Sequence, residues 1–285
     1  MPMTSRERVL TAINHEEPDR VPLVIGVNNA TGLKMKPYQG IKKIIGIEAP
    51  GNYIYDWPEL GTARVDEETM LRLHSDVRGV LDLEPESVRQ RNRRRPPHSD
   101  YIDSWGSGAT EIVPGDWYPG IHPLADAKSI EDLEQYTHWP DMDDATRVAH
   151  VAEEARKIRA DNQFATLATP WLLFPFERAH AMQGLQTFLL NMSLEPDFAR
   201  ALFDKITAHC KQLMGHFLDE LGENVDIIKI GDDLGTREHL MISPRMYRNL
   251  LKPFHADLIS MIKSRSDAKV FFHSCGDVEP LIGDF

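Results

Sequence analysis

The stretch PDFARALFDKITAHCKQLMGHFLDELGENVDIIKIGDDLG, residues 196–235, places a long helix directly before a buried strand. Apolar residues at near-helical spacing predict an amphipathic helix over residues 196–221; they are Phe198, Leu202, Phe203, Ile206, Leu213 and Phe217. The short, largely apolar run at 225–230 predicts a strand covered on both faces. A long helix followed at once by a buried strand is the repeating unit of a parallel α/β sheet.

The same alternation continues on both sides of this stretch. Further strands are expected at residues 21–27, 76–81, 164–168 and 268–272, and further helices at 4–14, 66–74 and 144–160. Thr4 and Glu7 have the spacing of a capping box, and Ser243 and Pro244 begin a helix that Pro253 is expected to kink. Residues 101–123, rich in glycine and aromatic residues, indicate an inserted hairpin or loop. We therefore expect one α/β domain over residues 1–285.

Composition excludes several classes of protein. The 285 residues have a net charge of −12, which argues against nucleic acid as the main partner. The longest apolar runs, such as 171–174, are far shorter than the roughly 20 residues of a membrane span, and the N-terminus has no signal-peptide pattern. We expect a cytoplasmic protein without a membrane partner. Its two cysteines are too few for a disulfide framework, so metal or thiolate chemistry is the better expectation for them.

One basic cluster stands out against this acidic background. Arginines occupy positions 89, 91, 93, 94 and 95, just before Pro96 and Pro97. The simplest interpretation is a solvated loop. The sharper one is a clamp for an anionic ligand or an acidic partner protein.

The strongest local signal for chemistry is the strand at 268–272 running into His273-Ser274-Cys275-Gly276. Catalytic groups of parallel barrels lie where strands end. An imidazole and a thiol two residues apart in extended chain point to the same side, so His273 and Cys275 could bind one zinc ion. The plain alternative is a half-buried cysteine beside a histidine bonded to a backbone carbonyl.

A second strand ends in Gly231-Asp232-Asp233-Leu234-Gly235. Two carboxylates at a strand end can bind a cation, hold a substrate or move a proton, although an Asp-rich turn would read the same way. Asp76 enters another strand and Trp171 follows a further one. The histidines at 180, 209 and 216 are expected on helix faces.

Taken together, these segments resemble the uroporphyrinogen decarboxylase superfamily. The resemblance rests on Arg6 to Leu10, Glu17 to Pro22, Gly231 to Gly235, Ser243-Pro244 and His273 to Gly276, in this order along nearly the whole chain. It implies a (β/α)8 TIM barrel with its site at the C-terminal mouth. Only about five of the eight strands are counted here, so the barrel is expected to be incomplete at the C-terminus. One branch of the superfamily decarboxylates porphyrinogens without a cofactor, and another comprises zinc methyltransferases that exchange methyl groups with a corrinoid protein.

The decarboxylase branch fits less well. Its arginine clamp is replaced here by residues 23–29, which include Asn28. Phe176 stands where that branch has a tyrosine, and Asp232 where it has a serine. Only Asp76 matches its aspartate facing the pyrrole nitrogens. A negative Asp232 would also repel a substrate with eight carboxylates.

The methyltransferase branch implies His273 and Cys275 as zinc ligands, with a later cysteine that would lie beyond Phe285. We therefore expect a zinc-dependent methyltransferase that moves a methyl group between a small molecule, either a methyl donor or a thiol acceptor, and a corrinoid protein. Asp232, Asp233 and Asp76 are the candidate catalytic residues, and Trp171, Phe176 and Asn28 the candidate substrate-binding residues. A uroporphyrinogen decarboxylase, with the arginine cluster as its clamp, and a non-catalytic corrinoid-binding partner are the alternatives.

Overall fold

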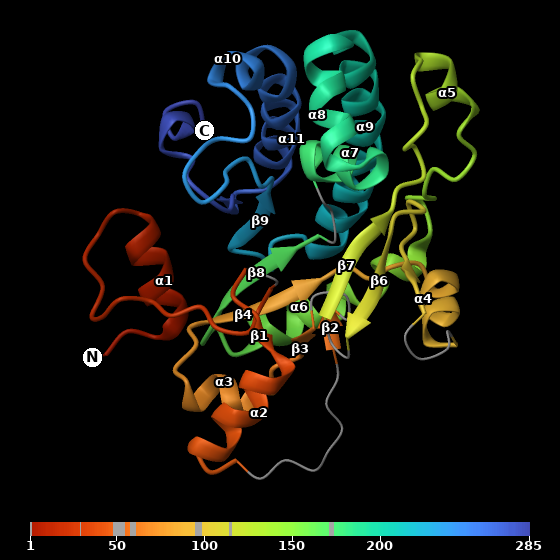
Figure 1. The fold of residues 1–285 in the computed structure, drawn as a ribbon. Coiled ribbons are helices and arrows are strands. Elements are labelled where there is room, and N and C mark those ends of the chain that lie inside the picture. The colour runs from red at the N-terminus through yellow and green to blue at the C-terminus, as the bar shows by residue number, and fades with distance from the viewer. Residues whose placement is uncertain are drawn as a thin grey trace.

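The computed structural model describes residues 2–28, 30–47, 55–57, 61–94, 99–113, 116–170 and 174–285. Its main sheet has the strand order β10-β9-β8-β4, with every pair parallel. The strands are β4 (Val77–Leu81), β8 (Ala165–Thr169), β9 (Ile227–Gly231) and β10 (Lys269–His273). This sheet, alternating along the chain with helices, confirms the predicted parallel α/β class (Figure 1).

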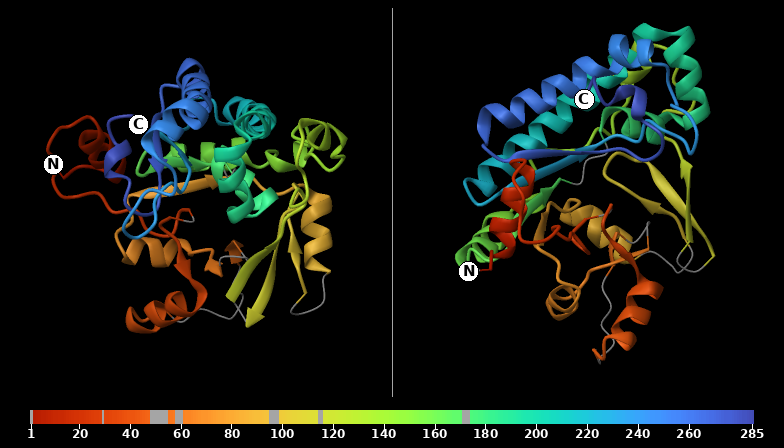
Figure 2. Two further views of the ribbon diagram at one scale, coloured as in Figure 1. Left: turned by 45° about the horizontal axis from the view of Figure 1, so that its top comes forward. Right: turned by 90° about the vertical axis from the view of Figure 1, so that its left-hand side faces the viewer.

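Helices alternate with these strands along the chain and lie around the sheet (Figures 1 and 2). They are α1 (Ser5–Ile13), α2 (Met35–Ile44), α3 (Glu67–Arg72), α4 (Glu86–Arg93), α5 (Ile130–Gln135), α6 (Val151–Ala160), α7 (Pro175–Gln183), α8 (Leu185–Leu194), α9 (Pro196–Leu221), α10 (Pro244–Met246) and α11 (Lys252–Arg265). Two 3₁₀ turns, Ala145–Arg147 and Glu279–Leu281, and a π-helical turn, Tyr247–Leu251, complete them. The predicted capping box at Thr4 and Glu7 and the predicted bounds of α9 are confirmed.

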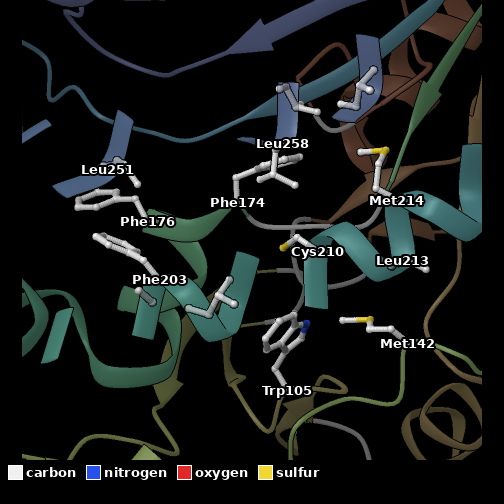
Figure 3. Close-up of a cluster of buried hydrophobic side chains, with 14 of the residues drawn as sticks. Trp105, Met142, Phe174, Phe176, Phe203, Cys210, Leu213, Met214, Leu251 and Leu258 are labelled. Atoms are coloured by element: carbon white, nitrogen blue, oxygen red, sulfur yellow. The ribbon is translucent and has the colours of Figure 1, made fainter. Parts of the chain in front are cut away.

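Side chains alternate between the two faces of the parallel sheet, and each face has its own core. The larger core joins the sheet to α7, α8, α9 and α11; its strand residues are Val80, Ala168, Ile228 and Ile230. Figure 3 shows part of this core, including Phe176, Phe203 and Cys210. The smaller core lies on the other face and includes Val9 of α1; its strand residues are Val77, Ala165, Leu167 and Ile227. Strands β4, β8 and β9 are therefore packed on both faces.

Residues 101–123 hold a separate antiparallel sheet in the order β5-β6-β7. Its strands are β5 (Tyr101–Ile102), β6 (Gly108–Val113) and β7 (Asp116–Ile121). A third small sheet joins β1 (Leu33–Lys34), β3 (Thr62–Ala63) and β2 (Tyr55–Trp57). In Figure 1 the β6–β7 hairpin stands beside the parallel sheet.

The expected strand at residues 21–27 is wrong as a regular strand. The segment runs beside the start of β4, where Asp76 N–H donates to the Leu23 carbonyl at 2.7 Å. Pro22 has no N–H to donate. The N–H groups of Leu23 and Ile25 are taken by the side chains of Asp76 and Ser75 rather than by a neighbouring strand. Hydrogen bonds to the Asp76 and Ser75 side chains thus replace the strand-to-strand hydrogen bonds that were expected for residues 21–27.

Two helix predictions are refined. Asp144 accepts a hydrogen bond from Thr146 N–H and caps a 3₁₀ turn, so α6 begins only at Val151. The expected kink near Pro253 takes the form of the π-helical turn between α10 and α11. Among the described residues, no helix combines the length and the apolar composition that crossing a bilayer requires.

Candidate metal centre

The carboxyl ends of β9 and β10 form the candidate site. The two strands pair in parallel with Gly231 opposite His273. Beyond this pair, Asp232 N–H donates to the His273 carbonyl at 3.0 Å, and Leu234 N–H donates to Ser274 Oγ at 3.0 Å. The pairing therefore continues past the strands and holds the two following loops together.

Glycines permit this close approach. Gly276 has φ +80°, a conformation that side chains rarely adopt. A Cβ atom on Gly276 would lie 2.3 Å from the carbonyl carbon of Gly235, which leaves no space for a side chain. Gly235 and Gly276, which end the loops after β9 and β10, are thus required where these two loops touch.

Three possible metal ligands meet at this junction. His273 Nε2 lies 3.4 Å from Cys275 Sγ and 3.5 Å from Asp233 Oδ1. One ligand atom from each of the three residues lies within 4.8 Å of the others. The structure therefore brings His273 and Cys275 together with Asp233, a residue from the other loop.

The donor set fits zinc. Nitrogen, sulfur and oxygen ligands at zinc bond lengths of about 2.0–2.3 Å in a tetrahedron are separated by roughly 3.3–3.7 Å. The two distances from His273 Nε2 fall in this range. Three protein ligands with a fourth open position are typical of catalytic zinc.

The protonation of the ligands agrees with a cation site. Burial, reinforced by Lys229, lowers the pKa of His273 despite the opposing effect of Asp233. The imidazole is therefore neutral near pH 7 and has a free lone pair. Burial raises the pKa of the Cys275 thiol to about 11, and Asp233 and Glu177 act in the same direction. Without a cation these carboxylates oppose formation of the thiolate.

A carboxyl group and an amine flank the ligands. Glu177 belongs to the first turn of α7. Burial, together with Asp232 and Asp233, raises the pKa of Glu177 well above the usual carboxyl range. Burial lowers the pKa of Lys229 on β9, although Glu177, Asp233 and Cys275 oppose that effect. The acidic side chains Glu177 and Asp232 and the amine of Lys229 thus surround the ligands, and the carboxyl groups interact unfavourably with one another unless a cation is bound.

Asp232 and Asp233 have different surroundings. The Asp233 side chain is 30% exposed and takes part in the ligand cluster. The Asp232 side chain has no exposure, and its oxygens accept hydrogen bonds from Phe176 N–H, Glu177 N–H and His255. Of the two predicted carboxylates, only Asp233 is open to a ligand or substrate.

Asp76 lies at the opposite end of its strand. It precedes β4, whereas Asp82 follows the carboxyl end. The Asp76 carboxylate is buried and bonds to Arg8 and Arg20 at 2.7 and 2.8 Å and to Ser5 at 2.7 Å. It therefore belongs to an ionic network that ties α1 to the sheet and not to the ligand cluster.

Two of the three predicted substrate-binding residues, Phe176 and Asn28, are buried. The Phe176 side chain lies in the hydrophobic core (Figure 3) and is fully buried. It packs against His180 and Phe188, so a substrate would have to displace it. Asn28 is 2% exposed, and its Oδ1 accepts bonds from Thr31 N–H and Oγ1. Trp171 lies outside the described residues.

Some residues near these strand ends were not predicted from the sequence. Glu177 and His255 contact Asp232 from helices α7 and α11, and their positions along the chain give no sign of this. Asp82 could have been found, because it directly follows the carboxyl end of a predicted strand.

The arginine cluster lies on and just after helix α4. Arg89 donates to the Glu84 carbonyl and Arg91 to the Ile102 carbonyl, whereas the Arg93 side chain is 66% exposed. Arg89 and Arg91 thus fix local backbone, and Arg95 is outside the described residues. This arrangement gives no support to a clamp formed by the whole cluster.

Comparison with known proteins identifies the family. The sequence model of uroporphyrinogen decarboxylase (URO-D) matches residues 111–285. The chain belongs to the uroporphyrinogen decarboxylase family. A solved structure of a methyltransferase from Methanosarcina mazei aligns with a TM-score of 0.52 and 20% sequence identity, covering 99% of this chain and 73% of that one. No curated protein sequence matches the chain.

At this identity, the structural likeness concerns the fold alone. Together with the parallel sheet, it is consistent with a TIM-barrel-like fold for this member of the URO-D family. The ligand cluster at the carboxyl ends of β9 and β10 occupies the face where such folds place their chemistry.

Proposed function

We propose that this URO-D family member is a zinc-dependent methyltransferase, moving a methyl group between a small molecule and a corrinoid held by a partner protein. The proposal rests on one observation: His273, Cys275 and Asp233 meet within 4.8 Å at the carboxyl ends of two parallel strands. The family resemblance predicts a later cysteine as the third ligand. In the proposed site, Asp233 supplies that third ligand.

The chain's own residues have distinct tasks in this proposal. His273, Cys275 and Asp233 bind the metal through Nε2, Sγ and Oδ1. The Cys275 N–H, which donates to Asp233 Oδ1 at 2.7 Å, keeps that carboxylate turned toward the other two ligands. When bound, zinc would lower the pKa of a thiol substrate or polarise the heteroatom of a methoxy or methylamine substrate. Asp232 has no access to substrate and instead holds the surrounding backbone.

The first experiment measures metal binding by the chain after removal of all metal. Titration with zinc is expected to give about one tightly bound ion per chain. Cys275→Ala should abolish this binding. Asp277→Asn, an exposed carboxylate two residues further on, is the matched control and should leave binding unchanged. Full zinc stoichiometry in the Cys275→Ala variant would remove Cys275 from the site and contradict the proposal.

A second experiment separates the possible activities. Methyl transfer from a methylated corrinoid protein to a thiol, or to that protein from a methoxy or methylamine compound, should depend on zinc. Turnover of uroporphyrinogen that is unaffected by a chelator would instead establish a decarboxylase. Corrinoid-protein binding without turnover, unchanged in Cys275→Ala, would establish a non-catalytic partner.

A further inference from the structure

The buried Asp232 carboxylate joins three elements behind the ligand cluster. Its Oδ2 accepts hydrogen bonds from Phe176 N–H at 3.0 Å and from His255 Nε2 at 2.8 Å, and its Oδ1 from Glu177 N–H at 2.8 Å. The Phe176 and Glu177 N–H groups belong to the opening turn of α7, where the helix dipole also favours an anion. Asp232 is thus bound to β9, α7 and α11 at once.

His255 is the side-chain partner of this carboxylate. It is 3% exposed, and its Nδ1 lies 3.2 Å from the Tyr247 hydroxyl. A carboxylate can only accept, so Nε2 donates to Asp232, and Nδ1 bonds to the Tyr247 hydroxyl. Both ring nitrogens are therefore used, and the orientation of the imidazole is fixed.

His255 also contacts β10, the strand that ends at the ligand His273 and leads to the ligand Cys275. Its ring meets Phe272 edge to face, with centroids 5.2 Å apart, and Phe272 directly precedes His273. Asp232 N–H in turn donates to the His273 carbonyl at 3.0 Å. The His255 side chain therefore contacts both Asp232, which precedes the ligand Asp233, and Phe272, which precedes the ligand His273.

The π-helical turn Tyr247–Leu251 precedes His255 on the same helical segment. Pro253 has no N–H and therefore cannot donate the α-helical hydrogen bond to the carbonyl four residues earlier. The regular α-helix loses one hydrogen bond at this point. Isolated π-helical turns of this kind are frequent at functional sites. Here Tyr247, the first residue of the turn, bonds to His255.

We propose that His255 is a positioning residue of the metal centre. It fixes the Asp232 carboxylate in one orientation. Asp232 in turn accepts hydrogen bonds from the first turn of α7 and donates its own N–H to the His273 carbonyl. Without His255 the buried carboxylate keeps the two backbone donors of α7 but loses its only side-chain donor among the three hydrogen bonds described, and with it the link from α11 to the loops bearing Asp233, His273 and Cys275. Residues that orient metal ligands from outside typically change metal affinity 10- to 100-fold. This inference rests on the proposed function for the identity of the ligand.

Three variants test the proposal through cobalt(II) binding, followed by its visible absorption spectrum. His255→Leu should weaken binding 10- to 100-fold and alter the spectrum. His255→Gln should restore most of the affinity, because its amide can donate to Asp232. Ile262→Ala removes a fully buried side chain from the same helix and is the control for lost stability alone. It should bind cobalt as the wild type does.

A metal-free measurement separates failure of this inference from failure of the proposed function. Hydrogen exchange of the amides of Phe176, Glu177 and Asp232 should accelerate in His255→Leu more than in Ile262→Ala, relative to the exchange of β8 in each variant. Equal exchange patterns and equal cobalt affinities in these two variants would overturn the positioning role. A wild-type chain that binds neither zinc nor cobalt would instead overturn the proposed function, and the exchange comparison would still decide the role of His255.

If His255→Leu does not fold, Tyr247→Phe provides the decisive variant. It keeps the buried ring and removes only the hydroxyl that bonds to His255. Faster exchange at Phe176 and Glu177 would support the proposal. Unchanged exchange at both residues in Tyr247→Phe would contradict it.

Discussion

The backbone N–H of Cys275 donates a 2.7 Å hydrogen bond to Asp233 Oδ1, although the two residues are 42 positions apart in the sequence. The bond connects the loop after β9 to the loop after β10. It also fixes the carboxylate that shares the ligand cluster with His273 and Cys275. The geometry of the cluster therefore depends on backbone as well as side chains.

Asp233→Asn tests the third ligand. The amide oxygen can still accept the Cys275 N–H bond, but the negative charge is lost. We expect zinc affinity to fall by at least about tenfold, with little change in unfolding free energy. Competition with a chromophoric chelator measures the affinity, and Asp277→Asn again serves as the control. Wild-type affinity in Asp233→Asn would show that this carboxylate is not a ligand.

The two cysteines should react differently with a thiol reagent. Cys275 is exposed and Cys210 is buried in the larger core (Figure 3). The native chain should therefore present one reactive thiol, and the second should appear only on unfolding. The raised pKa of Cys275 should make its reaction at pH 7 slower than that of a free thiol. Zinc should protect it, and equal rates with and without zinc would argue against ligation by Cys275.

Gly276→Ala tests the close approach of the loops. Both Gly276 and Gly222 have positive φ, so alanine at either costs on the order of 1–3 kcal/mol through backbone strain. Only at Gly276 would the added Cβ also collide with Gly235; at Gly222 it would meet no atom within 4 Å. We expect Gly276→Ala to lower stability further and to weaken zinc binding, whereas Gly222→Ala lowers stability only. Denaturant unfolding and zinc titration of both variants distinguish these effects.

The ionic network at Asp76 predicts a pH dependence of stability. Burial alone would raise the pKa of Asp76, but hydrogen bonds from Leu23 N–H, Ser5, Arg20 and Arg8 outweigh it and lower the pKa. A carboxylate with a lowered folded-state pKa stabilises the fold above its unfolded pKa of about 3.9. That contribution is lost as pH falls through the folded-state value.

Asp76→Asn should therefore cost roughly 3 kcal/mol of unfolding free energy at pH 7, as expected on breaking a buried ion pair. The difference from the wild type should shrink below about pH 4. Urea unfolding between pH 3 and 7 measures it, with the exposed Asp204→Asn on α9 as the control. A difference that stays constant over this pH range would contradict an ionic role for Asp76.

The elements whose signals are local could be predicted from the sequence. The helix at Pro196–Leu221, the capping box at Thr4 and the strands leading to Asp232 and His273 each have a periodicity or a capping residue that the chain itself displays. Residues 21–27 show where this fails. Their β-branched composition suits a strand, but the acceptors provided by Ser75 and Asp76 become visible only in three dimensions.

The candidate site was predictable in part for the same reason. His273 and Cys275 are neighbours in sequence, so their shared direction follows from the geometry of extended chain. The addition of Asp233 depends on the parallel pairing of β9 with β10, and the burial of Asp232 depends on α7 and α11. The sequence placed the two carboxylates together but could not show which one faces outward.

Parallel pairing of β9 with β10 has a consequence for how the chain acquires its structure. Parallel strands require a crossover segment between them and form contacts between residues distant in sequence, which makes such pairings slow to form. The Asp233 ligand lies on one side of this crossover, and His273 and Cys275 lie on the other. Affinity for the metal should therefore appear only late in folding, after the two strands have joined. In a refolding experiment, the rate of cobalt uptake would report the rate at which β9 pairs with β10.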